Sequence, residues 1–263
     1  MLGKLLKYDL KWIYKVLIVF YVLSIIFSLI GRLFIEIENS LIFNILGQVC
    51  IGTAIAMVVN VLINNLMRVW ARFIKNSYKD ESYLTHTLPV NRKTIFLSKV
   101  LSAIITMLTS AFVIVICVAI CYYSESTIEW VKQSLEFVAS TYNSTVVGFL
   151  LTVAAVFFLE MIFALFSGYI GIIIAHKSNN FKTGKSVIYG FIAYMVPQTI
   201  TIAIIFILGL FNQDIMNLFK TTDMINVEAI KSILHVGIVI YICYIVIYYF
   251  IGKRLFEKGV NID

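Results

Sequence analysis

The amino-acid sequence predicts an all-helical, polytopic membrane protein with six transmembrane helices. Of its 263 residues, 61% are hydrophobic and only 13% are charged, and the mean hydropathy is +0.95. A soluble domain keeps about a quarter of its residues charged, because its surface must be hydrated. A helical span needs roughly 20 apolar residues. Runs of that kind occur at residues 16–34, 45–67, 95–123, 146–175, 187–211 and 233–252.

Each apolar run is expected to be a helix, because backbone groups in lipid must form their hydrogen bonds within their own segment. The first run follows a lysine-rich segment without a small-residue cleavage site, so it is expected to be retained rather than removed as a signal peptide. The segments between the runs are too short for a second folded domain. Residues 1–263 are therefore predicted to form one transmembrane domain.

The basic residues of the chain gather on one side of the predicted bundle. With six spans, both termini lie on the same side as the loops that follow the second and fourth spans. This side carries most of the 21 lysines and arginines, as the positive-inside rule expects of cytoplasmic segments. Both termini are therefore predicted to be cytoplasmic, and the net charge of +7 needs no nucleic-acid partner.

The first 15 residues, MLGKLLKYDLKWIYK, predict an amphipathic helix at the inner membrane interface. Lys4, Lys7 and Lys11 keep to one side of this helix and leucines to the other, while Trp12 suits the level of the lipid headgroups. A plain positively charged start to the first span is the alternative.

Polar residues inside two of the apolar runs mark a candidate pathway. Glu160 lies near the middle of the fourth run, where a charged side chain costs about 2.5–3.5 kcal/mol on insertion scales. Ala164 and Gly168 share its helical face, and small residues let helices approach closely. In the fifth run, Pro197 is expected to kink the helix beside Gln198. Glu160 is either a pathway carboxylate or a structural hydrogen-bonding group, and Pro197 fits a gate or a static bend.

The sequence offers few residues for catalysis or metal binding. TGKS at 183–186 resembles the end of a phosphate-binding loop, but position 179 is Asn where that loop requires glycine. Cys117 and Cys121 are one helical turn apart without a nearby ligand to complete a zinc set, so we expect small buried hydrophobic residues. We therefore predict that the chain is not an enzyme and has no catalytic residue, metal or bound cofactor.

The segment NSYKDESYLTHTLPVNRK, residues 76–93, is longer than a minimal connection between two spans. Ser77 followed by Asp80 is an N-cap signal, which predicts a short helix over 78–86. Pro89 is expected to end this helix.

The flanks of this segment complete the pattern. The second span is expected to continue to about Lys75 and to project into the cytoplasm with Arg68 and Arg72, and Asn91 is expected to cap the helix that re-enters the membrane. An ordinary loop is the alternative, but the mixture of charged and aromatic groups indicates a docking surface.

The start LLKYDLKWIYK, the six spans and the stretch SYLTHTLPVNRKTIFLSK resemble the permease subunits of bacterial ATP-binding-cassette transporters of the ABC type 2 group. They are most similar to small permeases with a separately encoded ATPase. In that family the amino-terminal segment is an interfacial connecting helix, and a coupling helix between the second and third spans sits in a groove of the ATPase. The resemblance implies a coupling segment at 76–90, with these ATPase-facing residues: Ser77, Tyr78, Lys79, Asp80, Glu81, Ser82, Tyr83, Leu84, Thr85 and His86.

The resemblance implies the transmembrane subunit of an ATP-driven exporter in the bacterial plasma membrane. Its implied partners are an ATPase subunit, which would bind ATP and Mg, and a second permease that is identical or related. Peptides or other amphipathic or hydrophobic molecules are the expected cargo. Many members carry apolar re-entrant helices before the last span, but residues 212–232 are charged here, so we expect a surface cap. The alternatives are a substrate-capturing component of an uptake system and a membrane anchor or sensor.

Overall fold

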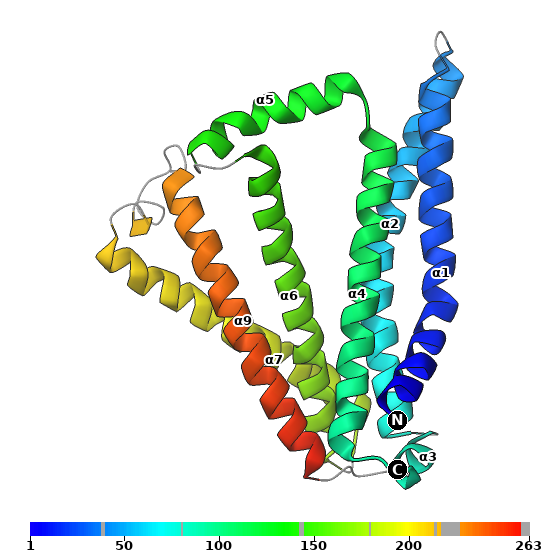
Figure 1. Cartoon of the computed structure of the whole chain (residues 1–263), viewed down its shortest axis with the longest axis vertical. Coiled ribbons are helices and arrows are strands. Elements are labelled where there is room, and N and C mark those ends of the chain that lie inside the picture. Colours follow the sequence, from blue (N-terminus) through cyan, green and yellow to red (C-terminus); the bar gives the residue numbers. More distant parts are fainter. Residues whose placement is uncertain are drawn as a thin grey trace. The chain divides into compact units, whose positions relative to one another are not determined.

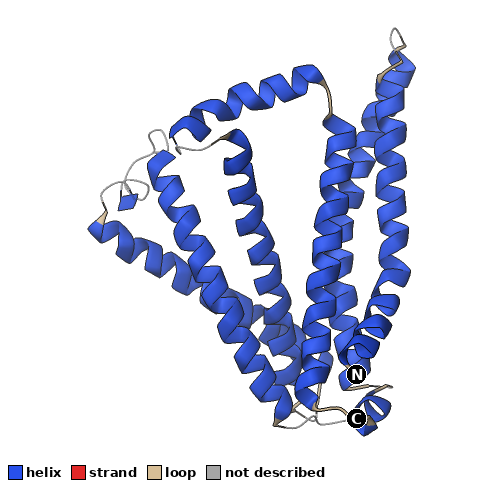
Figure 2. Cartoon of the chain, in the orientation of Figure 1, coloured by secondary structure: helices blue, strands red, loops and turns tan. Residues whose placement is uncertain are grey.

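The computed structural model describes residues 1–37, 40–79, 81–141, 145–178, 180–212, 215–216 and 227–258. All regular secondary structure in these ranges is helical (Figure 2). Six of the helices are long and apolar enough to cross a membrane, judged by length and composition. The predicted all-helical, polytopic fold is confirmed. The predicted surface cap at 212–232 lies largely outside the described residues.

The six long helices have 30 to 37 residues each. At about 1.5 Å per residue they exceed a hydrocarbon core of about 30 Å, so their ends extend beyond it. Two shorter helices, α3 and α5, lie between them (Figure 1). The bounds are α1 Leu2–Ile35, α2 Leu41–Ser77, α3 Ser82–Thr87, α4 Arg92–Tyr122, α5 Glu125–Thr141, α6 Val146–Ala175, α7 Lys182–Phe211 and α9 Val227–Glu257.

The contacts of the chain divide it into two compact units. Unit 1 contains α1, α2, α3 and α4, and α1 packs along both α2 and α4. Unit 2 contains α6, α7 and α9, and α6 packs along both of the others. Each unit is thus built around one helix that contacts two neighbours. That the whole chain acts as one permease domain stays a prediction.

The lysine-rich start and the first span form one continuous helix, α1. Asp9, Ile13 and Leu17 lie on its buried side, whereas the predicted lysine face is exposed, with Lys4, Lys7 and Lys11 all open to the surroundings. Residues 2–15 are therefore helical with an exposed lysine face, but α1 runs through them into the span, as the alternative of a positively charged start to the first span expects. Its position at the membrane interface stays a prediction.

Glycine allows the closest helix contact in unit 2. A Cβ atom built on Gly171 of α6 would lie 2.3 Å from the backbone nitrogen of Gly190 on α7 and 2.7 Å from the carbonyl oxygen of Ser186. These neighbours are backbone atoms and cannot move aside alone. The small-residue stripe of α6 therefore brings two helix backbones together, as small residues do in membrane proteins.

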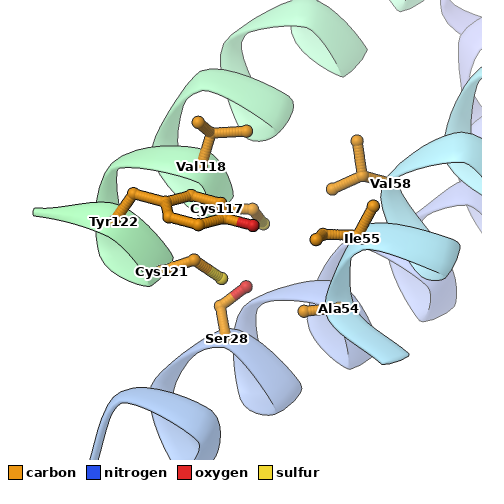
Figure 3. Close-up of a pocket in the computed structure, with 8 residues that line it drawn as sticks. All are labelled: Ser28, Ala54, Ile55, Val58, Cys117, Val118, Cys121 and Tyr122. Atoms are coloured by element: carbon orange, nitrogen blue, oxygen red, sulfur yellow. The ribbon is translucent and has the colours of Figure 1, made fainter. Parts of the chain in front are cut away.

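Unit 1 has a small apolar cavity of about 50 Å³ between α1, α2 and α4, partly open to the surroundings (Figure 3). Cys117 and Cys121 both line it and are buried, which confirms their predicted role as small hydrophobic residues. Ligand pockets usually measure about 300–1,000 Å³. The cavity is therefore a packing gap and not a pathway for cargo. Its lining consists of Ser28, Ala54, Ile55, Val58, Cys117, Val118, Cys121 and Tyr122.

Candidate functional site

The short helix predicted between the second and third spans is present as α3, but it begins later than expected. α2 continues through Ser77, and the N–H of Tyr78 still bonds to the carbonyl oxygen of Ile74. The predicted N-cap role of Ser77 is therefore wrong, because its backbone is already used by the preceding helix. Glu81 is the N-cap of α3 instead. Asp80 lies outside the described residues.

The predicted boundaries on the other side of α3 are correct. α3 ends at Thr87, two residues before Pro89, and Asn91 is the N-cap of α4. The carbonyl oxygen of Asn91 accepts the N–H groups of Thr94 and Ile95, but its side chain forms no capping bond. The break between α3 and α4 therefore depends on backbone geometry.

The side chains around α3 divide into a buried face and an exposed face. Tyr78, Ser82 and Thr85 are buried, whereas Tyr83 is 72% exposed and Leu84 is 68% exposed. A tyrosine and a leucine thus lie next to each other, open to the surroundings, on one turn of α3.

The buried face of α3 is anchored to the end of α2. The Tyr78 ring packs edge-on against Phe73 at 5.9 Å between centroids, and burial raises the pKa of Tyr78 well above its ordinary value of 10. His86 Nε2 lies 3.1 Å from the carbonyl oxygen of Ser77. Lys79 is exposed beside them. These contacts hold α3 close to the helix that precedes it.

A buried carboxylate, Asp9, joins three spanning helices of unit 1. Asp9 of α1 is 2% exposed, and its Oδ1 accepts hydrogen bonds from Arg72 Nε of α2 at 2.8 Å and from Lys99 Nζ of α4 at 2.6 Å. Ser98 Oγ donates to the other oxygen at 3.2 Å. One carboxylate thus stands between two buried cations, which is a favourable arrangement only because all three groups are close together.

Glu81 extends this charged group to the start of α3. Its Oε2 accepts a hydrogen bond from Arg72 Nη1 at 2.6 Å and one from Asn76 Nδ2 at 3.2 Å, and Lys75 Nζ lies 3.6 Å from Oε1. Partial burial alone would raise the pKa of Glu81, but the charge of Arg72 and these hydrogen bonds outweigh it and lower the pKa. We call Asp9, Arg72, Glu81 and Lys99 the charged joint.

The charged joint encloses a residue that was expected to project from the end of α2. Arg72 is 7% exposed, and its guanidinium is enclosed by Asp9 and Glu81. Trp12 of α1 also contacts α2: the Arg68 guanidinium lies 3.8 Å from the centre of its ring and donates to its carbonyl oxygen at 3.1 Å. The lysine-rich helix is therefore held by α2 on its buried side. The position of Trp12 at the headgroup level stays a prediction.

Unit 2 carries the predicted pathway residues. Glu160 of α6 is half-buried and accepts a hydrogen bond from Tyr194 Oη of α7 at 2.9 Å. The hydrogen bond to another helix, one of the two roles predicted for Glu160, is therefore present. The other predicted role, a carboxylate in a cargo pathway, stays a prediction. Ala164 continues the face of Glu160, and the Cα atom of Gly168 would lie 3.6 Å from a Cβ atom built on Gly190 of α7.

Pro197 lies within α7, which continues through it. Proline has no N–H for the carbonyl oxygen of Ala193, four residues earlier. Tyr248 Oη of α9 donates to that freed oxygen at 2.6 Å. Tyr244 Oη donates to the carbonyl oxygen of Pro197 itself at 3.1 Å. Two tyrosines of α9 therefore satisfy the backbone of the proline-containing turn.

Gln198, the polar residue predicted beside Pro197, is also bonded to a tyrosine of α9. Its Nε2 donates to Tyr241 Oη at 3.2 Å. The rings of Tyr194, Tyr241, Tyr244 and Tyr248 all lie 5.3–5.9 Å from the buried ring of Phe163, measured between centroids. An aromatic cluster with polar hydroxyls thus occupies the space between α6, α7 and α9.

Among the described residues, no group of three or more His, Cys, Asp or Glu side chains lies close enough to hold an ion. Comparison with family models, with curated proteins and with solved structures finds no match to this chain. The chemistry of the two regions, a charged joint beside an exposed docking face and a carboxylate beside tyrosines, is therefore the basis for assigning a function.

The sequence analysis missed the residues that connect the predicted ones. Asp9 was not singled out, although it is the only acid in the first 15 residues. Lys99 was counted among the cytoplasmic cations, yet it is 3% exposed. Tyr241, Tyr244 and Tyr248 follow one another at helical spacing, a signal that could have indicated one polar stripe on an otherwise apolar helix.

Proposed function

We propose that this chain is the transmembrane subunit of an ATP-driven exporter, and that α3 docks on a separate ATPase subunit. The observation that supports this most directly is that Glu81 begins α3 and also belongs to the charged joint. A helix that exposes Tyr83 and Leu84 is thereby tied to α1, α2 and α4. A displacement of α3 would therefore be transmitted to three spanning helices together.

In this proposal the chain itself hydrolyses nothing. ATP and Mg bind the partner ATPase, and closure of the ATPase pair displaces α3 of each of two permeases, which are identical or related. The buried ion pairs are costly to separate, so α1, α2 and α4 move together and not one by one. ATP acts through the partner and cargo through the spanning helices, each by favouring one of two states.

The proposal also fixes an orientation. Asp9 of α1 bonds to Arg72 near the end of α2, so the amino terminus and α3 lie at the same end of unit 1 (Figure 1). Since α3 must meet a soluble ATPase, this end is cytoplasmic, in agreement with the positive-inside rule. The proposed location is the bacterial plasma membrane, and the proposed cargo is a peptide or another amphipathic or hydrophobic molecule.

Affinity purification of the tagged chain from mild detergent, followed by an ATPase assay, tests the proposal. We expect an ATPase to co-purify with the parent protein and to be lost or uncoupled when Tyr83→Ala and Leu84→Ala are combined, because two exposed anchors are removed. Tyr8→Ala is the matched control, since Tyr8 is 66% exposed but lies on α1.

Two results would contradict the docking role of α3. One is that no ATPase co-purifies in several detergents. The other is that Tyr8→Ala has the same effect as the double variant. Tight binding of a small ligand by the chain without any ATPase would favour the substrate-capturing component of an uptake system instead.

A further inference from the structure

Unit 2 holds a carboxylate inside a spanning helix without a basic partner among the described residues. The Glu160 carboxylate accepts one hydrogen bond there, at Oε1 from Tyr194, and forms no ion pair. Its position near the middle of α6 makes an uncompensated negative charge costly, by about 2.5–3.5 kcal/mol on insertion scales. A proton or an external cation must balance this charge.

The side chain is open enough for an external cation to reach it. Glu160 is only half-buried, and Oε2 has no hydrogen-bond partner among the described residues. Phe157, one helical turn earlier on α6, is 49% exposed. Glu160 and Phe157 therefore lie one helical turn apart on α6, and both side chains are partly exposed.

The surroundings of Glu160 select the kind of cation. Mg²⁺ and Ca²⁺ need several oxygen ligands, and one carboxylate with one phenol does not provide them. Aromatic rings instead attract ammonium-type cations through their negative faces, most strongly where water is excluded. Tyr194, which stacks on Phe163 at 5.7 Å, and the exposed Phe157 supply such rings. A cation with apolar substituents would satisfy both the carboxylate and the aromatic surface.

We propose that Glu160, Tyr194 and Phe157 form a binding site for monovalent hydrophobic organic cations. Oε2 of Glu160 supplies the negative charge, the hydroxyl of Tyr194 orients the carboxylate through Oε1, and the ring of Phe157 covers the apolar substituents of the ligand. That these cations are carried across the membrane rests on the proposed exporter function. Binding itself does not.

Equilibrium binding of radiolabelled tetraphenylphosphonium to the purified chain in lipid nanodiscs tests the site. We expect saturable binding by the parent protein and at least about tenfold weaker binding by Glu160→Gln, which removes the charge and keeps the shape, a loss of about 1.4 kcal/mol. Glu160→Asp is expected to retain part of the affinity because it restores the charge. Glu129→Gln is the control, since Glu129 is an exposed acid on α5.

Equal affinity of the parent protein and Glu160→Gln would overturn the proposal, as would the absence of saturable binding by the parent. Size-exclusion chromatography checks the folding of Glu160→Gln and Glu160→Asp. If both variants elute as the parent protein does, misfolding is excluded as the cause of weaker binding. The exporter function is tested by a different result, the co-purification of an ATPase. Saturable binding without a co-purifying ATPase supports the cation site and contradicts the exporter, whereas a co-purifying ATPase without binding does the reverse.

Discussion

Unit 1 and unit 2 accommodate polar side chains among apolar helices in two different ways. In unit 1, Asp9 is compensated by two buried cations, Arg72 and Lys99, at one end of the helices. In unit 2, Glu160 is bonded to a neutral tyrosine, and further tyrosines bond to the backbone around Pro197. Unit 1 thus adds ion pairs at Asp9 to neutral hydrogen bonds such as that of Asn65 with Ser110, whereas the groups around Pro197 in unit 2 are joined by neutral hydrogen bonds.

This difference indicates different mechanical properties. Removing one partner of a buried ion pair costs about 3–5 kcal/mol, because the other charge is left buried and unpaired. A neutral hydrogen bond between membrane helices contributes only about 0.6 kcal/mol on average. We infer that the helices of unit 1 are fixed to one another near α3, while those of unit 2 can exchange partners at small cost. The first property suits transmission of force, and the second suits a pathway for cargo.

The largest expected effect is that of Asp9→Asn. This substitution leaves Arg72 and Lys99 buried beside each other without a carboxylate between them, so we expect a loss of about 3–5 kcal/mol in unfolding free energy. Chemical denaturation of the purified protein in detergent measures it. Lys7→Gln on the exposed face of the same helix is expected to change little.

Lys99→Met sharpens this comparison. It removes one cation but leaves Asp9 paired with Arg72 at 2.8 Å, so each remaining charge of the joint keeps a partner. We therefore expect Lys99→Met to destabilise unit 1 less than Asp9→Asn does. An equal or larger loss with Lys99→Met would show that packing of the long side chain, and not charge balance, stabilises this group.

The closest helix contact of unit 2 gives the next effect in size. In Gly171→Ala, the new methyl group would meet the backbone of Gly190 at 2.3 Å to nitrogen and 2.5 Å to Cα. The two helices must separate, which we expect to cost about 1–3 kcal/mol. The control Gly237→Ala places a methyl group where no atom lies within 4 Å, and it is expected to be neutral or stabilising by about 0.5–1 kcal/mol. Thermal unfolding of both variants in detergent distinguishes the two cases.

The elements of this fold could be predicted from the sequence because the signals are local. Apolar runs of spanning length, the lysine face of α1 and the break at Pro89 each depend on neighbouring residues only. The start of α3 was placed too early for the same reason. Serine is a residue type that often caps helices, which is why Ser77 was predicted as an N-cap. The helix α2 nevertheless continues through Ser77, next to the buried contact of Tyr78 with Phe73.

The charged joint and the tyrosine cluster could not be predicted, because they depend on pairing between distant segments. Asp9 and Lys99 are 90 residues apart, and Ala193 and Tyr248 are 55 apart. A count of charges assigned Lys99 to the cytoplasmic side, although it lies within the apolar run 95–123, and nothing in the sequence indicates that Asp9 is its partner. Glu160 was recognised because a carboxylate within an apolar run is unusual whatever its partner is.

The pH dependence of unit 1 tests how Glu81 contributes to the charged joint. Its pKa lies below the ordinary value of 4.5 in the folded protein, so its stabilising contribution is complete above that value and is lost as the pH falls through the folded pKa. The melting temperature of Glu81→Gln should therefore lie below that of the parent protein at pH 7, and the difference should shrink below about pH 4.5. In the control Glu36→Gln, which removes an exposed pair with Arg32, we expect little difference at either pH. A constant difference for Glu81→Gln across this range would contradict the role of its charge.

The smallest expected effect is that of Tyr248→Phe in unit 2. This change removes the hydroxyl that donates to the freed carbonyl oxygen of Ala193 and keeps the ring that packs on Phe163. We expect a loss of about 0.6 kcal/mol, and no more than about 1.7 kcal/mol, because a membrane helix can find other donors for an exposed carbonyl group. Restoring a backbone donor with Pro197→Ala should make the same tyrosine change nearly neutral, since the helix then satisfies the Ala193 carbonyl itself. A double-mutant cycle on unfolding free energies measures this coupling, and additive losses would mean that the Tyr248 hydroxyl does not act through the Ala193 carbonyl.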